Sequence, residues 1–286
     1  MTVLIIGGSG FLGSELVRQA AAAGLETAAT FASRPDEASA AAWHQLDLRE
    51  PVHIARVMAD VAPSVVVNAS SGKSDWAVTA DGAARVALAA AERDCRLIHV
   101  SSDAVFSGSA DRYDESRLPD PLTPYGAAKA AAETAVRLAA PGAAVARTSL
   151  IIGQGQSEHE RMVHGLAAGR RAGVLFSDDI RCPVHVADLA AALWEIALSD
   201  AAGVFHLAGP DAVSRHDLGV LIAHSQGLDA GRLPAGRRAD TSLPGPLVVR
   251  LDSRATQERL RTRLRGAREF LAGDGSADTA AAVAAT

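Results

Sequence analysis

The sequence contains little cysteine, and this scarcity argues against two kinds of stabilisation. Of its 286 residues only Cys95 and Cys182 are cysteines, and they lie far apart with no CxxC spacing. A zinc site built on cysteines and a disulfide framework are therefore not expected. We predict that each thiol is a small buried apolar side chain and that the protein holds no metal.

Long apolar runs and a basic leader are also absent from the sequence. No segment approaches the roughly 18 consecutive apolar residues of a membrane-spanning helix, so we expect no association with a membrane. The first apolar run, residues 3–6, has no basic region before it and ends at once in Gly7 and Gly8. This pattern does not fit a signal peptide, and we expect the protein to be cytoplasmic.

Positive charge is outnumbered by negative charge. The 28 lysines and arginines stand against 33 aspartates and glutamates, which gives a formal net charge of −5. The sequence therefore offers no basic surface for nucleic acid. Nearly all of the basic residues are arginine, because Lys73 and Lys129 are the only lysines; Tyr113 and Tyr125 are the only tyrosines.

The composition and the patterning are those of one large α/β domain. Hydrophobic residues make up 48 % of the chain and charged residues 21 %, which allows a core and excludes global disorder. Apolar and β-branched runs predict strands at residues 2–6, 25–31, 64–68, 96–101 and 143–147, and the intervening stretches predict helices at 11–23, 51–62, 81–93 and 124–138. Strands that alternate with helices in this way indicate a Rossmann-like, doubly wound parallel sheet.

The pattern becomes less regular after about residue 153. Helices are predicted at 158–171, 186–198, 215–225 and 253–264. We expect residues 1–152, with parts of 183–210, to form the nucleotide-binding domain, and residues 153–272 to form most of a smaller C-terminal substrate-binding lobe. Residues 273–286 have no large apolar side chain before Val283 and are predicted to be a disordered tail.

A glycine-rich turn separates the first predicted strand from the first predicted helix. It reads Gly7-Gly8-Ser9-Gly10-Phe11-Leu12-Gly13 and satisfies the GxGxxG spacing. Such a turn lets the backbone approach a pyrophosphate, and the free N–H groups of the following helix favour that anion. We therefore predict a dinucleotide site that includes Gly7, Gly10, Phe11, Leu12 and Gly13.

The end of the second strand indicates which dinucleotide binds. An acidic residue there would bind the 2′-hydroxyl of NAD, but no acid occurs before Asp36. Ser33 and Arg34 offer a hydroxyl and a planar cation, which suit a 2′-phosphate. We therefore expect NADP(H) in preference to NAD(H), although Arg34 could also be a solvated loop charge.

Two further strand ends are predicted to border the cofactor. Asp47 and Leu48 follow an apparent strand end and are placed beside the adenine. Asn68, Ala69 and Ser70 end the third predicted strand, where the nicotinamide half of the cofactor would run.

Tyr125 and Lys129 stand at positions i and i+4 of a predicted helix and so share one of its faces. A phenol with its ordinary pKa near 10 exchanges protons poorly at neutral pH, and a nearby cation stabilises the phenolate. Ser102 ends the fourth predicted strand, where its hydroxyl could hold a carbonyl oxygen opposite the tyrosine. Taken alone, Ser102 is equally well explained as a strand-end cap.

Together these motifs resemble the extended short-chain dehydrogenase/reductase superfamily and, within it, the dTDP-4-dehydrorhamnose reductase family. The resemblance covers residues 1 to about 272 and rests on the glycine turn, the YGAAK segment and four further segments, SSDAVFSG at 101–108, VVNA at 66–69, RTS at 147–149 and VRLD at 249–252. It implies an NAD(P)-dependent oxidoreductase.

The resemblance also implies residue roles. Tyr125 is the general acid, Lys129 binds the nicotinamide ribose and lowers the pKa of the tyrosine, and Ser102 orients the carbonyl. The substrate contacts implied are Ser102, Asp103, Val105, Phe106 and Arg181. Arg181 stands where the superfamily places an arginine on the diphosphate of a nucleotide sugar, and a structural ion pair is the alternative for it.

Two departures from the family pattern leave the substrate open. Leu150 stands where reductases of this family usually have tryptophan after Arg-Thr-Ser, and residues 178–184 replace their Asp-Gln-x-Gly-x-Pro-Thr segment. These departures leave two alternatives, a different sugar or a substrate that is not a nucleotide sugar.

The leading hypothesis is an NADPH-dependent reductase of a nucleotide-linked, dTDP-type 4-keto-6-deoxysugar. An NAD-dependent nucleotide-sugar epimerase and a non-catalytic, NADP-binding regulatory subunit are the alternatives. Dehydration is disfavoured because Ala104 stands where dehydratases have glutamate. A nucleotide sugar is the expected partner, and a homodimer is left open.

Overall fold

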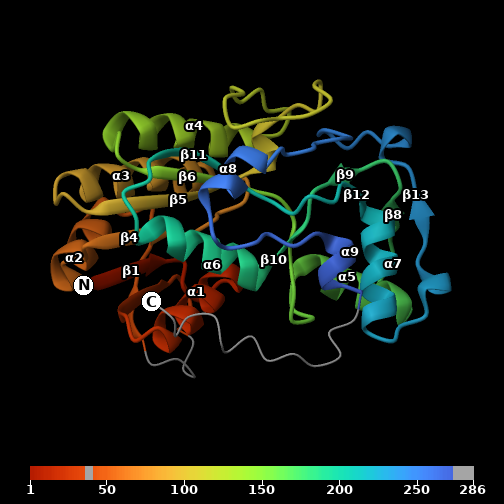
Figure 1. Ribbon diagram of the computed structural model, residues 1–286, viewed down its shortest axis with the longest axis horizontal. Helices are drawn as coiled ribbons and strands as arrows, with labels where there is room; N and C mark the ends of the chain where they lie inside the picture. The colour runs from red at the N-terminus through yellow and green to blue at the C-terminus, as the bar shows by residue number, and fades with distance from the viewer. Residues whose placement is uncertain (36–40, 273–286) are drawn as a thin grey trace.

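A seven-stranded parallel sheet lies at the centre of the computed structural model, which describes residues 1–35 and 41–272 (Figure 1). The strand order is β11-β6-β5-β4-β1-β2-β3, and every neighbouring pair runs parallel. The strands are β1 (Thr2–Ile6), β2 (Glu26–Phe31), β3 (Ala42–Gln45), β4 (Val65–Asn68), β5 (Arg96–Ser102), β6 (Ala144–Thr148) and β11 (Gly203–Leu207). The predicted Rossmann-like, doubly wound sheet is confirmed.

Helices cover both faces of this sheet. One face packs against α1 (Phe11–Ala22) and α6 (Val186–Ala197), and the other against α2 (Pro51–Val61), α3 (Gly82–Ala91) and α4 (Pro124–Ala139). Val3 and Ile5 of β1 belong to the first core cluster, whereas Leu4 and Ile6 belong to the second. Because β1 is buried on both sides, its sequence is continuously apolar rather than alternating.

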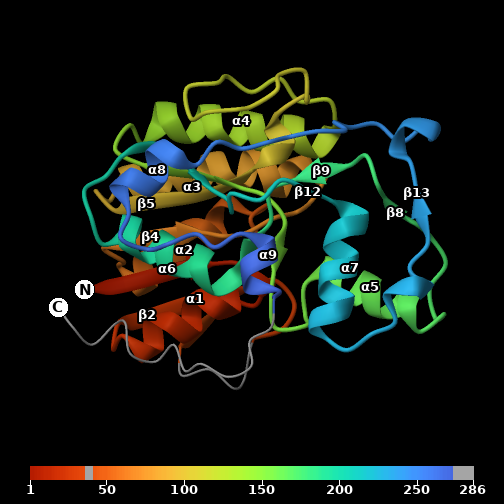
Figure 2. The same ribbon diagram turned by 45° about the vertical axis from the view of Figure 1, so that its right-hand side comes forward.

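A second group of elements lies beyond the carboxyl ends of the strands, as two views agree (Figures 1 and 2). This group includes β7 (Ile151–Ile152), α5 (Glu158–Ala167), β8 (Leu175–Phe176), β9 (Ile180–Arg181), β10 (Val184–His185), β12 (Val213–Ser214), α7 (Arg215–Ser225), β13 (Ala235–Gly236) and α9 (Ala267–Phe270). Helix α8 (Arg254–Arg259) instead lies against β11, where the Thr256 hydroxyl accepts the His206 amide. The core of the group joins α5, α7 and α9 through side chains such as Val163, Leu218 and Phe270. The domain boundaries given above stay a prediction, and the predicted tail at 273–286 lies outside the described residues.

The structure corrects several predicted elements. Strands β3 and β11 were not among the predicted strands. The helix predicted at 158–171 ends at Ala167, because Gly169 adopts a left-handed backbone with φ of +66° and closes the last turn. The helix predicted at 253–264 stops at Arg259, because the amides of Arg261 and Thr262 donate to the Glu195 carboxylate instead of continuing the helix.

Close packing of the glycine turn sets the distance between β1 and α1. Gly7 has a φ of +82°, and its carbonyl accepts the Gly10 amide at 3.0 Å. A methyl group on Gly13 would lie 2.0 Å from the Gly7 carbonyl oxygen, well inside contact distance. Glycine at position 13 therefore allows the helix to start directly against the turn.

Among residues 1–35 and 41–272, none of the helices combines the length and the apolar character that a bilayer crossing requires.

We predict that Gly13→Ala lowers the free energy of unfolding by at least about 1–3 kcal/mol, because the added methyl group has to push the turn away from α1. Urea unfolding measures the change. Gly142→Ala is the matched control, since a methyl group there meets no atom within 4 Å. Equal stability of the two variants would contradict the packing argument.

Candidate active site

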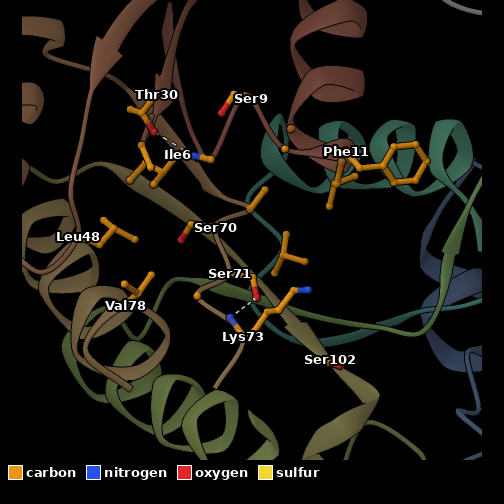
Figure 3. Close-up of a pocket in the computed structure, with 18 of the residues that line it drawn as sticks. Ile6, Ser9, Phe11, Thr30, Leu48, Ser70, Ser71, Lys73, Val78 and Ser102 are labelled. Carbon is orange, nitrogen blue, oxygen red and sulfur yellow. Dashed lines mark hydrogen bonds between the residues drawn. The ribbon is translucent and has the colours of Figure 1, made fainter. Parts of the chain in front are cut away.

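A pocket of about 800 Å³ opens at the carboxyl ends of the parallel strands (Figure 3). It extends from the glycine turn past the ends of β1, β2, β4 and β5 to the start of α4 and to the segment after β6. The carboxyl edge of a parallel sheet is where folds of this kind bind ligands. The position of the pocket alone therefore makes it the candidate site.

Most of the predicted site residues line this pocket. They are Gly7, Gly10, Phe11, Leu12, Gly13, Ser33, Asp47, Leu48, Ala69, Ser70, Ser102, Tyr125 and Lys129. Two predicted cofactor residues lie outside the lining. Asn68 is buried, and its side-chain oxygen instead accepts the Ser70 amide and hydroxyl. Arg34 is exposed, next in sequence to the pocket-lining Ser33.

The glycine-turn end of the pocket is suited to an anion. Helix α1 begins after Gly10, which has no side chain to cap the first turn. The amides of that turn therefore point toward the pocket without a side-chain acceptor, at the positive end of the helix dipole. The turn is fixed to β2 because the Gly7 amide donates to the Thr30 hydroxyl at 3.0 Å.

Ser102 ends β5 and has two tasks in the structure. Its hydroxyl oxygen accepts the Ala104 amide at 3.2 Å, which caps the short 3₁₀ turn η2 (Asp103–Val105). The same hydroxyl lies 3.3 Å from a carboxylate oxygen of Asp103, to which it can donate. The strand-end cap is thus real, and it places the Ser102 side chain at the wall of the pocket.

Tyr125 stands at the start of α4, where local sequence fixes its position. Pro124 opens the helix, and the Thr123 hydroxyl caps it by accepting the Gly126 amide at 3.0 Å. Burial raises the pKa of Tyr125 above its ordinary value, and hydrogen bonds with Ser102 and Ser71 only partly offset this. The predicted lowering of the tyrosine pKa is therefore not found in this structure.

Lys129 lies one turn further along α4 and is buried. Its ammonium group donates to the Val100 carbonyl at 2.9 Å and lies 3.5 Å from the Ser70 carbonyl. Burial lowers the pKa of Lys129 to about 8, although the negative charge of Glu133 has the opposite effect and raises it. The amine is therefore held at the back of the pocket between β5 and the loop after β4.

The predicted substrate contacts beyond Ser102 do not reach the pocket lining. Val105 and Phe106 are completely buried, because η2 turns them into a core cluster in which Phe106 stacks on Tyr113 at 4.1 Å. Their side chains therefore have structural positions rather than the implied contact positions. Asp103 is also buried and accepts the hydroxyl of Ser149, which does line the pocket, at 2.6 Å.

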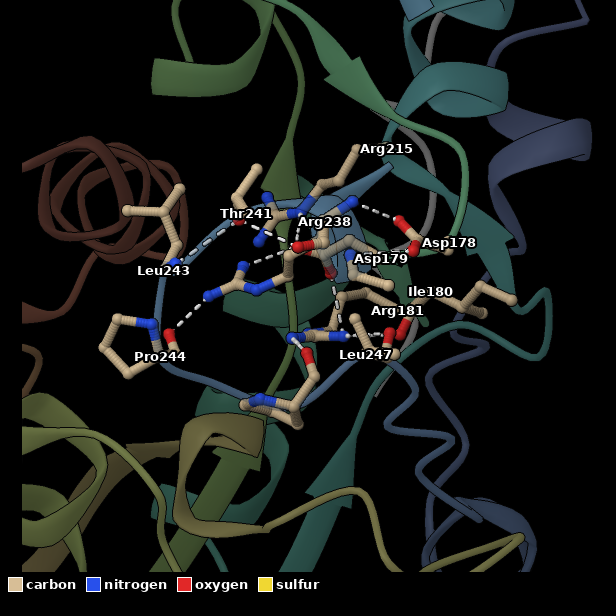
Figure 4. A network of polar contacts seen from close by, with 12 residues as sticks. Asp178, Asp179, Ile180, Arg181, Arg215, Arg238, Thr241, Leu243, Pro244 and Leu247 are labelled. Carbon is tan, nitrogen blue, oxygen red and sulfur yellow. Dashed lines mark hydrogen bonds and ion pairs between the residues drawn. The ribbon is translucent and has the colours of Figure 1, made fainter. Parts of the chain in front are cut away.

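Arg181 belongs to a buried ion-pair network beside the pocket (Figure 4). It is 6 % exposed, and its Nη1 lies 2.8 Å from Oδ1 of Asp179. The same Nη1 donates to the Leu247 carbonyl and Nη2 donates to the Pro246 carbonyl, while Nε lies 3.7 Å from Asp103. Of the two roles considered for Arg181, this geometry supports the ion pair; contact with a diphosphate stays a prediction.

The pocket also contains side chains that the motifs did not reveal. Ser71 and Lys73 line it from the loop after β4, and Glu158 lines it from α5. The Lys73 ammonium lies 3.5 Å from the Glu158 carboxylate, so an ion pair joins the two sides of the pocket. The sequence offers one signal that could have identified Lys73 as a site residue, namely that it is one of only two lysines in the chain. No group of three or more metal-ligating side chains occurs in the described part of the chain.

Comparisons with known proteins agree with this architecture. Residues 1–273 match the RmlD substrate binding domain family. The dTDP-4-dehydrorhamnose reductase of Mycolicibacterium smegmatis is 32 % identical over 278 residues, which cover 94 % of this chain and 83 % of that protein.

Solved structures show the same fold. A dTDP-4-dehydrorhamnose reductase from Bacillus anthracis in complex with NADP has a TM-score of 0.78 at 20 % identity, over 94 % of this chain and 96 % of that one. The UDP-glucose 4-epimerase of Thermus thermophilus in complex with NAD has a TM-score of 0.79, also at 20 % identity, over 95 % and 98 %. Since reductases and epimerases share the fold, these likenesses do not choose between the activities.

We predict that Arg181→Ala lowers the free energy of unfolding by about 1–3 kcal/mol, because the Pro246 and Leu247 carbonyls lose the hydrogen bonds that Arg181 donates. Arg215 and Arg238 still compensate the charge of Asp179. Urea unfolding tests this. Arg237→Ala is the control: Arg237 is exposed and lies 3.9 Å from Asp178, so its loss should change stability by less than about 0.5 kcal/mol. A variant of wild-type stability with a raised substrate KM would instead support the diphosphate contact.

Proposed function

The chain belongs to the RmlD substrate binding domain family, and on that premise we propose that it is an NADPH-dependent reductase of a nucleotide-linked, dTDP-type 4-keto-6-deoxysugar. The observation that carries the proposal is that the groups needed for the reaction share the pocket described above. An uncapped helix N-terminus lies at one end of it, and Ser102, Tyr125 and Lys129 lie together at the other. A hydride donor and a carbonyl acceptor need this combination in one cavity.

The pocket fits NADP(H) at the glycine turn. Gly7, Gly10 and Gly13 keep this turn compact, because a methyl group at any of them would meet backbone atoms of the turn or of Ser70. The α1 amides can therefore face the position where a pyrophosphate would lie. Ser33 lines the pocket at the end of β2, where a 2′-phosphate would be recognised. When bound, NADPH supplies the hydride that reduces the carbonyl carbon.

Tyr125 donates the proton that completes the reduction. Its phenol is protonated at neutral pH, as a proton donor must be, but its raised pKa makes it a weak acid, so the proposal requires a nearby cation to stabilise the phenolate. The carbonyl oxygen would receive this proton, so that the reduced ketone would leave as an alcohol, and the phenolate would regain a proton from water. The Ser102 hydroxyl donates a hydrogen bond to the same oxygen and orients it.

Lys129 supplies positive charge behind the tyrosine. The Val100 and Ser70 carbonyls hold its ammonium group at a fixed place. A cation there favours the phenolate that forms as Tyr125 gives up its proton, and it also offers donors to the ribose of the cofactor.

The substrate end of the pocket departs from the family pattern. Ser149 and Ile151 line it, whereas Leu150 between them packs against the core of α5, α7 and α9. An aliphatic residue at 150 replaces the aromatic surface that related reductases place near the sugar. The identity of the keto sugar is therefore the part of the proposal that needs direct measurement.

Turnover of NADPH against a panel of dTDP- and UDP-linked 4-keto sugars tests the function. Consumption of NADPH with formation of a 4-hydroxy sugar supports a reductase. Tightly bound NAD in the purified protein, with interconversion of sugar epimers and no net consumption of NADPH, would replace it with the epimerase. NADPH binding without turnover of any sugar would favour the regulatory subunit.

We predict that NADPH binds at least several-fold more tightly than NADH, because Ser33 and Arg34 stand where an NAD site needs an acid. Arg34→Ala should narrow this preference, since one charge-assisted phosphate contact is worth about 1.5–3 kcal/mol. Titration with both nucleotides measures it. Arg56→Ala, an exposed arginine on α2, is the control. Equal affinity of the wild type for NADPH and NADH would refute the prediction.

We predict that Tyr125→Phe lowers kcat by about 10²–10⁴-fold, the usual contribution of a general acid, while the fold and nucleotide affinity persist. Lys129→Arg should retain less than about a tenth of the activity, because a broad guanidinium displaces the compact ammonium group. Steady-state kinetics measure both effects.

Tyr113→Phe is the matched control for the tyrosine. Tyr113 is buried and does not line the pocket; its hydroxyl accepts the Ala110 amide and forms hydrogen bonds with the Ser107 and Ser109 side chains. Its loss should cost about 1 kcal/mol of stability and leave kcat unchanged. Near wild-type rates for both Tyr125→Phe and Lys129→Arg would rule out this mechanism.

A further inference from the structure

A buried carboxylate that no motif revealed lies one helical turn beyond Lys129. Glu133 is 2 % exposed, on the same face of α4. The Ser101 hydroxyl donates to Oε1 of Glu133 at 2.6 Å. Arg147 donates to the same carboxylate, through Nε to Oε1 at 3.0 Å and through Nη2 to Oε2 at 2.8 Å. This carboxylate therefore joins α4 to both β5 and β6.

The three elements that meet at Glu133 are the elements that carry the reactive end of the pocket. Ser101 directly precedes Ser102 on β5, and α4 carries Tyr125 as well as Lys129. Arg147, on β6, is fully buried and is fixed by a hydrogen bond to the Arg117 carbonyl at 3.1 Å. The carboxylate is thus held in place by groups on the two neighbouring strands.

Lys129 has few groups around it that can balance its charge. Its hydrogen-bond acceptors, the Val100 and Ser70 carbonyls, are neutral. His99 faces it from β5, but burial and the Lys129 charge lower the pKa of His99 to about 3, so the imidazole is neutral. Tyr125 on α4 is also neutral at physiological pH, because its pKa is raised.

Glu133 supplies the missing negative charge. Burial lowers the pKa of Lys129 to about 8, and among the groups that the structure describes Glu133 is the one whose charge acts in the opposite direction. Nη2 of Arg147 lies 2.8 Å from Oε2 of Glu133, and this ion pair compensates for the burial of the carboxylate.

We propose that Glu133 is a positioning residue that keeps Lys129 charged and in register with Tyr125, while Arg147 and Ser101 fix its carboxylate. The inference deepens the proposed function and rests on the role given there to Lys129. The Glu133–Arg147 pair would join the three elements whether or not it acts on Lys129. An effect of Glu133 on the titration of Lys129 is expected only if its charge also acts on the ammonium group.

The scarcity of lysine makes a direct test practicable. The chain has two lysines, so selectively labelled lysine gives two side-chain NMR signals. Lys73→Arg assigns them by removing the signal of the exposed residue. In the wild type we expect the Lys129 signal to titrate near pH 8.

The test variant is Glu133→Gln combined with Arg147→Gln, which removes both charges and leaves neither partner buried alone. The midpoint of the Lys129 titration should fall by about one pH unit, since a lost opposite charge at short range disfavours the ammonium form. Glu195→Gln is the control, because Glu195 lies on α6, which covers the opposite face of the sheet. In this variant the midpoint of the Lys129 titration should equal that of the wild type.

A second variant keeps the test valid if the double variant does not fold. Glu133→Asp retains the charge that Arg147 requires but withdraws the carboxylate by one methylene group. It should lower the midpoint in the same direction by a smaller amount. An unchanged Lys129 midpoint in either variant, once it is shown to be folded, would overturn the proposal and leave Glu133 a structural tie.

This outcome is independent of the proposed function, because the titration needs neither sugar nor cofactor. A lowered midpoint in a protein that reduces no keto sugar would support the coupling and reject the reductase. If the protein reduces a keto sugar but the midpoint of the Lys129 titration is unchanged in the variants, the reductase is supported and the coupling between Glu133 and Lys129 is rejected. In an active enzyme, the alkaline limb of kcat/KM should also move to lower pH in the double variant.

Discussion

The buried ammonium group of Lys129 is the constraint on which the arrangement of the reactive end depends. A charge at this depth loses its hydration and must be compensated by fixed groups. The compensation comes from the carbonyls at the ends of β4 and β5 and from Glu133 on its own helix. Each of these groups fixes α4 against the sheet. The groups that compensate the charge of Lys129 therefore also determine how Tyr125 is placed relative to Ser102.

A second electrostatic chain connects this end of the sheet to the elements beyond it. Asp103 follows Ser102 directly; it accepts the Ser149 hydroxyl and lies 3.7 Å from Arg181. Arg181 in turn pairs with Asp179, which two further arginines, Arg215 and Arg238, also approach. These contacts connect the C-terminal elements to the strand end that carries Ser102.

The parts of the structure that could be predicted were those whose signals are local. The apolar strand runs, the glycine turn and the i, i+4 spacing of Tyr125 and Lys129 need only a few neighbouring residues. The sequence pattern predicts too long a helix α5, because nothing in it shows that Gly169 adopts a left-handed backbone and ends the helix. Glu133 and Arg147 are 14 residues apart, and no short pattern marks their pairing. The inward turn of Phe106 likewise depends on a tertiary partner, Tyr113.

Lysine occupies two positions in this chain, and only one of them meets solvent. The Lys129 side chain is enclosed, whereas that of Lys73 is 80 % exposed at the rim of the pocket, beside Glu158. Reagents that acylate primary amines usually scatter over a protein surface. Here, apart from the amino terminus, they meet a single lysine, because arginine carries nearly all the remaining positive charge. Amine chemistry is thus directed to the entrance of the site, where an attached group would stand in the path of an arriving ligand.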